Sequence, residues 1–500
     1  MKAILILMDT LNRHMLKVYN PEAKAITPNI DRLAERSMIM CNHWIGSAPC
    51  MPARRDILTG RLNFLERGWG SIEPFDVTFV EKLRNNGVFC HITTDHYHYT
   101  AIGGEGYLQQ YDTWDLHRGQ ESDVWVSNTK DPENIPERYL GQIRKQYQWN
   151  RSNFKTDADY PTPRTFASAV EWLRENEGAD DFFLTVEVFD PHEPFDATDE
   201  FKALYPHQYD GPVYEWPKYA AIEEETPEAL EHLQNLYCAT LTMADKWLGK
   251  LLDEVDRQNL WDDTLIILTS DHGHMLGEHG LTGKNLFHAW NEMSHIPLLI
   301  HQPGGKQSGV RSDALTQNID IASTLLEYFN VPGGVESMPD VHGKSWTPLF
   351  DDPGASIRDY ALYGWFGKPV NITDGRYTYF RAAKDDLNSP LYMYMSMLTT
   401  FRSYLGRNIS SEALSVGNYL PHAKIPVYRI DASVINARMP AQMRDNRHHK
   451  DSLLFDIQND YSQKNPLSDS NIEKQMIEAL IRKMEEHDAP SEQFMRLGLR

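Results

Sequence analysis

The stretch AILILM, residues 3–8, is a continuous apolar run that ends at the polar pair Asp9 and Thr10. A run of this kind is typical of a strand that is buried on both faces of a parallel sheet. Three further runs show the same pattern, at 88–93, 182–189 and 264–268. Their polar tails read TDHYHY, DPHEPF and TSDHGH. The sequence therefore predicts four buried strands, each followed by polar side chains.

Helical patterns separate these runs, at 29–36, 163–175 and 227–255. Alternating strands and helices predict an α/β fold with a large, mostly parallel or mixed sheet sandwiched between helices. In such sheets ligands bind at the carboxyl ends of the strands. We therefore expect the four polar tails to gather at one edge of the sheet and to form the functional site.

The pattern of predicted strands and helices changes near residue 350. The last helical pattern before this point is stopped by Pro332 and two glycines, and short alternating stretches, loops and one amphipathic helix at 470–487 follow. We expect a catalytic α/β domain at 1–350 and a smaller α+β domain at 351–500 that completes the substrate pocket. The run YMYMSM, 392–397, fits core or subunit packing better than a soft recognition surface.

The composition restricts the possible partners. The chain has 500 residues and a formal net charge of -22, which argues against binding to nucleic acid or to an anionic membrane. The N-terminal apolar run is shorter than the core of a signal peptide, and no stretch approaches the length of a membrane span. The four cysteines lack the spacing of a disulfide framework or a zinc site. We therefore expect a cytoplasmic protein with reduced thiols.

Two carboxylates and one imidazole stand on the predicted strand tails. Asp9 follows the first run, and Asp271 and His272 follow the last. Together they can bind a divalent cation, because hard oxygen donors favour calcium, magnesium or manganese, while the imidazole leaves softer metals open. Taken alone, Asp9 is better explained as a helix cap or a turn residue. The expected convergence of remote tails favours the metal site.

The segment GSAPCMPARRDILTGR, residues 46–61, places Cys50, Pro52 and Arg54 in the pattern C-x-P-x-R, followed by T-G after four residues. This pattern resembles the signature of the type I, formylglycine-dependent sulfatases of the alkaline phosphatase superfamily. Other segments resemble that family in the same order along the chain. They are MDTLNRHML, FDPHEPF, TSDHGHMLGEHGLTGK, DIASTLLEYFNV, HGKSWTPLF and SLLFDIQNDYSQKNPL. The resemblance covers nearly the whole chain.

The resemblance implies that a formylglycine-generating enzyme oxidises Cys50 to formylglycine (3-oxoalanine). It also implies one divalent metal ion, with Ca²⁺ expected first and Mg²⁺ or Mn²⁺ as alternatives. Its ligands would be Asp9, Asp271, His272 and the modified Cys50. A hydrated aldehyde carries two hydroxyls on one carbon. One attacks sulfur as a covalent nucleophile, and deprotonation of the other expels sulfate and regenerates the aldehyde.

The resemblance also assigns roles to single residues. Arg54 would hold the hydroxyl that later collapses, and His98 would be the base of the elimination step. His192 would contact the sulfate and the leaving-group oxygen. Lys284 matches a lysine on the same atoms, where a cation stabilises developing negative charge. Without the resemblance, a lone lysine is usually a solvated surface residue.

Two departures from the family pattern bear on the reaction class. The usual Gly-Lys pair is Asp95–His96 here, so we expect His96 to replace the sulfate-binding lysine. The first metal strand ends in Asp9–Thr10 instead of Asp-Asp, and the second ends in Asp-His instead of the frequent Asp-Asn. The Asp-His form also occurs in some sulfatases and in phosphonate monoester hydrolases, which resemble this chain in the same way.

We therefore expect hydrolysis of a sulfate ester of a carbohydrate or of a small alcohol or phenol. Two alternatives stay open. One is hydrolysis of phosphate diesters or phosphonate monoesters by the same site, and the other is binding of sulfated ligands without turnover if Cys50 is unmodified. Tyr97, Tyr99 and the segment 114–125 are candidates for the rim of the pocket, although packing explains them equally well.

Overall fold

The structure is a computed structural model that describes residues 1–284, 288–338, 340–398, 410–432 and 451–500. Its centre is an eight-stranded sheet in the order β13-β2-β12-β9-β1-β7-β5-β6. In that order the strands are Arg311–Ser312, Met38–Met40, Leu298–His301, Thr264–Thr269, Lys2–Met8, Phe182–Val188, Phe89–Thr94 and Thr113–Leu116. The four predicted strands are β1, β5, β7 and β9, and they pair in parallel. Because β12 runs antiparallel to β9 and β2, the sheet is mixed.

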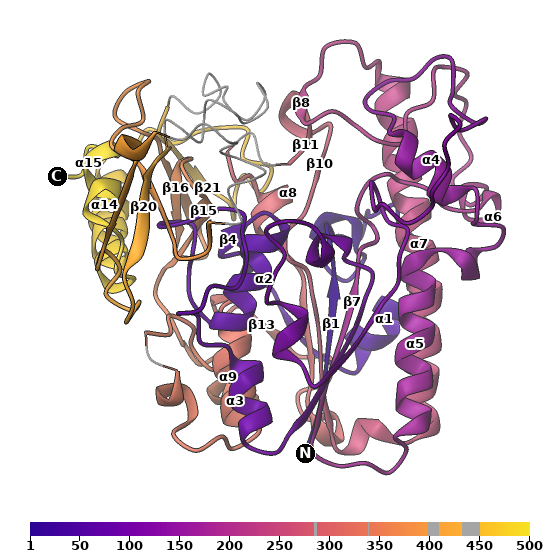
Figure 1. The fold of residues 1–500 in the computed structure, drawn as a ribbon, viewed down its shortest axis with the longest axis horizontal. Helices are drawn as coiled ribbons and strands as arrows, with labels where there is room; N and C mark the ends of the chain where they lie inside the picture. Colours follow the sequence, from indigo (N-terminus) through magenta and orange to yellow (C-terminus); the bar gives the residue numbers. More distant parts are fainter. Residues whose placement is uncertain (285–287, 339, 399–409, 433–450) are drawn as a thin grey trace.

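Two layers of helices cover this sheet (Figure 1). The layer on one face contains α1 (Pro28–Glu35), α5 (Pro161–Glu175) and α7 (Pro227–Arg257), and the layer on the other contains α2 (Cys50–Thr59), α3 (Phe79–Asn85) and α9 (Asp320–Tyr328). Side chains of β1 alternate between the layers: Ile4 and Ile6 pack with the first, Leu5 and Leu7 with the second. After Lys2 the strand is apolar because both of its faces are buried. The α/β prediction and the three predicted helices are confirmed, each helix within two residues at its ends.

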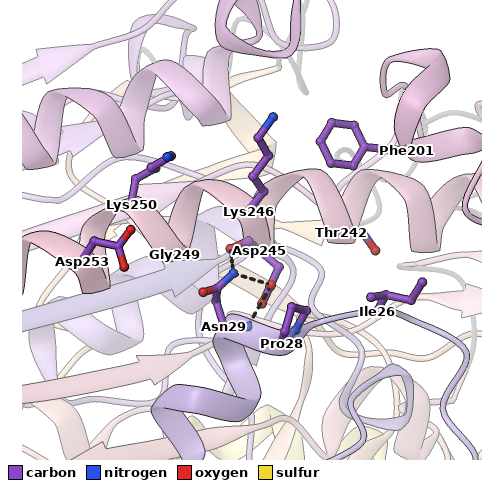
Figure 2. A pocket seen from close by; sticks show the side chains of 10 residues that line it. All are labelled: Ile26, Pro28, Asn29, Phe201, Thr242, Asp245, Lys246, Gly249, Lys250 and Asp253. Carbon is purple, nitrogen blue, oxygen red and sulfur yellow. Dashed lines mark hydrogen bonds between the residues drawn. The ribbon is translucent and has the colours of Figure 1, made fainter.

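Helix α1 is anchored on α7 by a buried carboxylate. Asp245 of α7 accepts hydrogen bonds from the backbone N–H groups of Asn29 and Ile30, at 3.0 and 2.7 Å, and so caps the first turn of α1 (Figure 2). A hollow of about 360 Å³ lies beside this contact and is lined by Phe201 and Lys246, among others. It belongs to the helical layer and holds none of the predicted site residues.

A second sheet lies beside the first, in the order β21-β17-β16-β15-β4. Its strands are Leu453–Asp456, Tyr377–Arg381, Val370–Thr373, Ala361–Trp365 and Ser47–Ala48. Helix α14 (Ser470–Glu486) contacts β15 and β16, close to the helix predicted at 470–487. The edge strand β4 comes from the segment that precedes Cys50 and pairs in parallel with β15. The division at residue 350 therefore stays a proposal, with one strand of the first part inside the second sheet.

Smaller elements complete the described chain. A third sheet contains β18 (Tyr392–Met395), β20 (Val427–Asp431) and β19 (Leu414–Gly417). Met393 and Met395 are buried there beside Ile430, which confirms the packing interpretation of the YMYMSM run for these residues. The short strands are β3 (His43–Trp44), β14 (Thr316–Gln317), β8 (Ala220–Ala221), β10 (Met275–Leu276) and β11 (Leu281–Gly283), and the short helices are α4 (Lys145–Arg151), α6 (Asp199–Lys202), α8 (Asn291–Ser294), α10 (Thr347–Asp351) and α15 (Ser491–Arg496).

Two expectations from composition can be compared with the structure. All four cysteines are free, as predicted from their spacing. Among the described residues, no helix combines the length and the apolar character that crossing a membrane requires.

Candidate active site

Four predicted ligands converge at the carboxyl ends of β1 and β9. Asp9 follows β1, Asp271 and His272 follow β9, and Cys50 opens α2. One donor atom from each of them lies within 4.8 Å of the others, and all four side chains are buried. The tails of β1 and β9 therefore meet as expected from the sequence, together with the cysteine of the segment 46–61.

The segment before Cys50 is tied down by a buried aspartate of α2. Asp56 accepts hydrogen bonds from the backbone N–H and the hydroxyl of Ser47, at 2.5 and 2.8 Å, and from the side-chain amide of Asn63 at 2.6 Å. Ser47 belongs to β4, so this network fixes the entry to α2 against the second sheet. All ten residues of α2 are buried, and the Cys50 sulfur is held 3.2 Å from His272 Nε2.

The tautomer of His272 suits a ligand. Its Nδ1 lies 2.9 Å from the carbonyl oxygen of Gly273 and must carry the proton to donate there, which leaves the Nε2 lone pair directed at the site. Burial lowers the pKa of His272, so the imidazole is neutral. A neutral imidazole with a free Nε2 is the form in which histidine binds a metal ion.

Thr10 takes part in the site through its backbone. Its φ of 63° is unusual for a β-branched residue. This conformation lets the Thr10 N–H donate to Asp271 Oδ1 at 3.1 Å, while its hydroxyl donates to Asp9 Oδ1 at 2.6 Å. Thr10, which stands where the family has a second aspartate, thus orients both carboxylates.

Arg54 lies among three carboxylates. Its Nη2 is 2.8 Å from Asp9 and its Nη1 is 2.5 Å from Asp271, while its Nε contacts Glu187. Nη1 also donates to the backbone carbonyl of Cys50 at 3.1 Å. Burial alone would raise the pKa of Asp9, but Arg54 and other nearby cations hold it well below its usual value. Arg54 therefore helps to hold Asp9 in its ionised form.

The charges of the cluster leave a deficit of positive charge. Two buried side-chain cations, Arg54 and Lys284, form ion pairs with four buried carboxylates at this edge. Asp9, Asp271 and Glu187 surround Arg54, and Glu193 lies beside Lys284. The histidines do not correct the deficit, because burial lowers the pKa of His192 to about 4 and that of His98 to about 3. The ion-paired carboxylates outnumber their cations, an arrangement that suits a bound cation.

Lys284 and His192 are buried close to the ligand cluster. Lys284 Nζ is 3.8 Å from the Cys50 sulfur and 3.3 Å from the Thr10 hydroxyl. His192 Nδ1 is 2.6 Å from the carbonyl oxygen of Glu193. Both predicted residues are thus brought to the same end of the sheet as the ligands, and each also contacts Glu193.

The two histidines of the β5 tail differ in exposure. His96 is fully buried, with its Nδ1 3.8 Å from Asp9 Oδ2, and neither of its ring nitrogens has a hydrogen-bond partner among the described residues. Burial and Arg54 hold its pKa well below the usual value. The His98 side chain keeps 18% exposure, and its ring lies 5.0 Å from that of His96. Asp95 connects the tails of β5 and β7, since it accepts a hydrogen bond from the Phe189 N–H at 2.7 Å.

Three buried glutamates at the site were not singled out from the sequence, although Glu121 lies within the candidate rim segment 114–125. Glu187 interrupts the otherwise apolar strand FFLTVEV, and a charged residue in a fully buried strand is a signal that could have found it. Glu193 follows His192 directly. Glu121 reaches the site from the loop after β6, where its carboxylate accepts from the Tyr97 hydroxyl at 2.7 Å and lies 3.7 Å from His192 Nδ1.

Comparisons with known proteins agree with this geometry. The family model described as Sulfatase matches residues 2–331. The multifunctional alkaline phosphatase superfamily protein PehA of Trinickia caryophylli is 26% identical over 412 residues, which are 67% of this chain and 73% of that protein. The choline-sulfatase of Rhizobium meliloti (strain 1021) is 25% identical over 422 residues, which are 76% of this chain and 78% of that protein.

The fold also occurs in solved structures. One is the structure of BT4656 in complex with its substrate D-glucosamine-2-N,6-O-disulfate. It superposes with a TM-score of 0.65 at 16% identity and covers 97% of this chain and 98% of the other. The expected alkaline-phosphatase-like architecture is therefore confirmed along nearly the whole chain.

Proposed function

Because the chain belongs to the sulfatase family, and relatives named sulfatases are sulfuric ester hydrolases, we propose that it cleaves a sulfate ester of a carbohydrate or of a small alcohol or phenol. The observation that carries this proposal is the buried cluster of Cys50, Asp9, Asp271 and His272, with Lys284 3.8 Å from the cysteine sulfur. Hydrolysis of a tetrahedral ester such as a sulfate ester requires a nucleophile, ligands for a metal ion and a fixed cation. This cluster supplies a position for each of them.

The donor set fits one divalent cation, for which we propose Ca²⁺, with Mg²⁺ or Mn²⁺ as alternatives. Two carboxylates supply hard oxygen donors, His272 supplies an unprotonated Nε2, and the carboxylates at this edge outnumber the cations paired with them. Asp9, Asp271, His272 and the modified Cys50 would hold it. When bound, the ion supplies positive charge to the sulfate oxygens and lowers the pKa of a nearby hydroxyl.

We propose that Cys50 acts as formylglycine, so its sulfur marks the position of the reactive oxygens. Formylglycine supplies two hydroxyls on one carbon, one for attack and one for release of sulfate. Because Cys50 is 2% exposed and the whole of α2 is buried, a formylglycine-generating enzyme would have to act before the chain folds.

The remaining roles are assigned to side chains at the same edge. Lys284 and His192 would stabilise the negative charge that develops on the leaving-group oxygen, and His98 would accept the proton in the release of sulfate. His96 would contact the sulfate, and Arg54 would orient the nucleophile through the Cys50 carbonyl and the ligand carboxylates. A cytoplasmic location and the division into 1–350 and 351–500 are part of the same proposal.

A substrate panel tests the proposed function. Enzyme produced with a formylglycine-generating enzyme, and checked by the mass of the peptide that contains Cys50, is loaded with Ca²⁺ and offered sulfated mono- and disaccharides, choline sulfate and aryl sulfates. Phosphonate monoesters and phosphate diesters are offered in parallel. Release of sulfate with the highest kcat/KM supports the proposal. Preferred turnover of phosphonates or diesters would replace it, and tight binding without turnover would indicate a sulfated-ligand binder.

A further inference from the structure

We propose that Glu193 is a positioning residue that holds His192 and Lys284, the two side chains assigned to the leaving-group oxygen. The inference rests on the proposed hydrolysis of a sulfate ester. Glu193 lies in the β7 tail DPHEPF, between His192 and a proline.

One carboxylate oxygen of Glu193 faces three nitrogen atoms. Its Oε2 lies 3.5 Å from His192 Nδ1, 3.8 Å from Lys284 Nζ and 3.3 Å from His274 Nε2. Its Oε1 accepts a hydrogen bond from the Tyr219 hydroxyl. The side chain has no exposed surface. Glu193 therefore connects the two proposed donors through a single buried group.

The buried carboxylate and its neighbours stabilise each other's charge. A buried carboxylate is costly unless it is paired. Burial alone would raise the pKa of Glu193, but His192 and Lys284 hold it well below its usual range. The distance of 3.8 Å between Glu193 Oε2 and Lys284 Nζ describes a buried ion pair that holds the amine at this position.

The contact with Glu193 also sets the direction of His192. Since Nδ1 donates to the Glu193 carbonyl at 2.6 Å, Nε2 is the nitrogen left for the substrate. A carboxylate beside Nδ1 favours protonation of the ring, which burial otherwise keeps neutral. Once Nε2 has taken a proton from solvent, it can pass that proton to the leaving-group oxygen as the S–O bond electrons move to that oxygen. The other charged or titratable groups that face His192 are Glu121, Asp9, Lys284, His96 and His98.

Lys284 is held between Glu193 and the nucleophile position. Its Nζ lies 3.8 Å from Glu193 Oε2, 3.8 Å from the Cys50 sulfur and 3.3 Å from the Thr10 hydroxyl. Loss of the Glu193 carboxylate would remove the contact that holds the Lys284 amine beside Glu193. Both donors to the leaving group would then lose orientation together.

The variant Glu193→Gln keeps the shape and the acceptor for Tyr219 but removes the charge. We measure kcat/KM on a series of aryl sulfates with increasing leaving-group pKa, from 4-nitrophenyl sulfate to phenyl and 4-methoxyphenyl sulfate. Donation to the leaving group contributes about 100- to 10,000-fold in rate. We expect Glu193→Gln to lose about 10- to 100-fold on the poorest leaving group and about threefold or less on 4-nitrophenyl sulfate. Glu193→Asp, which keeps the charge, should restore part of the loss.

Glu66→Gln is the matched control. Glu66 is also a buried glutamate, 2% exposed, but its partners are Arg67 at 3.5 Å and His422 at 3.4 Å. This control shows how far the loss of a buried carboxylate changes kcat/KM through reduced stability alone. It should lower the melting temperature without changing the dependence of kcat/KM on the leaving group.

The outcomes separate this inference from the proposed function. If Glu193→Gln reduces kcat/KM equally on all aryl sulfates, Glu193 does not position the leaving-group donors. If the modified, metal-loaded wild type hydrolyses no sulfate ester, the proposed function fails. The pKa of His192, followed by ¹⁵N NMR of histidine-labelled protein, then decides the inference: a lower pKa in Glu193→Gln supports it, and an unchanged pKa overturns it.

Discussion

Replacing Arg54 with lysine tests how the site is held together. Arg54 reaches three carboxylates from three different nitrogen atoms. Its Nη1 contacts Asp271 at 2.5 Å, its Nη2 contacts Asp9 at 2.8 Å, and its Nε contacts Glu187. A lysine ammonium donates from a single point and cannot follow the planar fork of a guanidinium. Arg54→Lys should therefore lose two of the three charge-assisted hydrogen bonds.

The expected size of this loss follows from the contacts. A hydrogen bond to a charged group contributes about 1.5–3 kcal/mol, so two lost bonds predict a fall of about 3–6 kcal/mol in the free energy of unfolding. Arg55→Lys on the same helix is the matched control. Arg55 is also buried, but its Nη2 donates to two backbone carbonyls, of Gly68 at 2.8 Å and Gly70 at 3.1 Å, and one ammonium can replace that nitrogen. The control should lose about 1 kcal/mol.

Urea denaturation in excess Ca²⁺, followed by circular dichroism and tryptophan fluorescence, measures both variants. The account requires Arg54→Lys to unfold at clearly lower urea than Arg55→Lys and to lose turnover of the sulfate ester. If the free energy of unfolding falls by less than about 1 kcal/mol in Arg54→Lys, or by no more than in Arg55→Lys, Arg54 is not the group that holds the three carboxylates together.

Three further predictions use other parts of the structure. Chelation with EDTA should abolish turnover and lower the melting temperature, and Ca²⁺, Mg²⁺ or Mn²⁺ should restore both; full activity in enzyme shown to be metal-free by elemental analysis would contradict the ligand assignment. Cys50→Ala should abolish sulfate release but keep the circular dichroism spectrum, and more than trace activity would exclude Cys50 as the nucleophile. Burial raises the pKa of Asp245 to about 6. Between about pH 4, the value in the unfolded chain, and pH 6 the folded protein binds a proton at Asp245 that the unfolded chain has lost, so the contribution of Asp245 to stability falls as pH rises through this window. Asp245→Asn should flatten this slope in thermal unfolding, whereas an unchanged slope would show that Asp245 is not its source.

The central strands and the ligand set could be predicted because both depend on local patterns. A strand that is covered on both faces is mostly apolar, as β1 is from Ala3 to Met8, and its polar tail marks where it ends. Parallel pairing then brings Asp9 together with Asp271 and His272, although about 260 residues separate them in the chain. The pattern around Cys50 supplied the fourth ligand through its resemblance to a family.

The supporting carboxylates could not be predicted because their partners are distant in the sequence. Glu121 is directed into the site by a loop whose neighbour, Gln120, donates to Asp95 at 2.8 Å. Nothing within that loop indicates this contact. Likewise, β4 has two residues, too few for any periodicity, and its pairing with β15 depends on a strand more than 300 residues away. Glu193 resembles any polar loop residue until Lys284 is placed beside it.

The central claim is that a formylglycine made from Cys50 hydrolyses a sulfate ester. Its most direct test compares turnover with the degree of modification. Preparations with different formylglycine occupancy, made by varying co-expression of the modifying enzyme and measured by peptide mass, are loaded with Ca²⁺ and assayed for sulfate release from the best ester of the panel. The account predicts that kcat per total protein rises in proportion to occupancy and passes through zero for unmodified Cys50. Sulfate release that is independent of occupancy would contradict it.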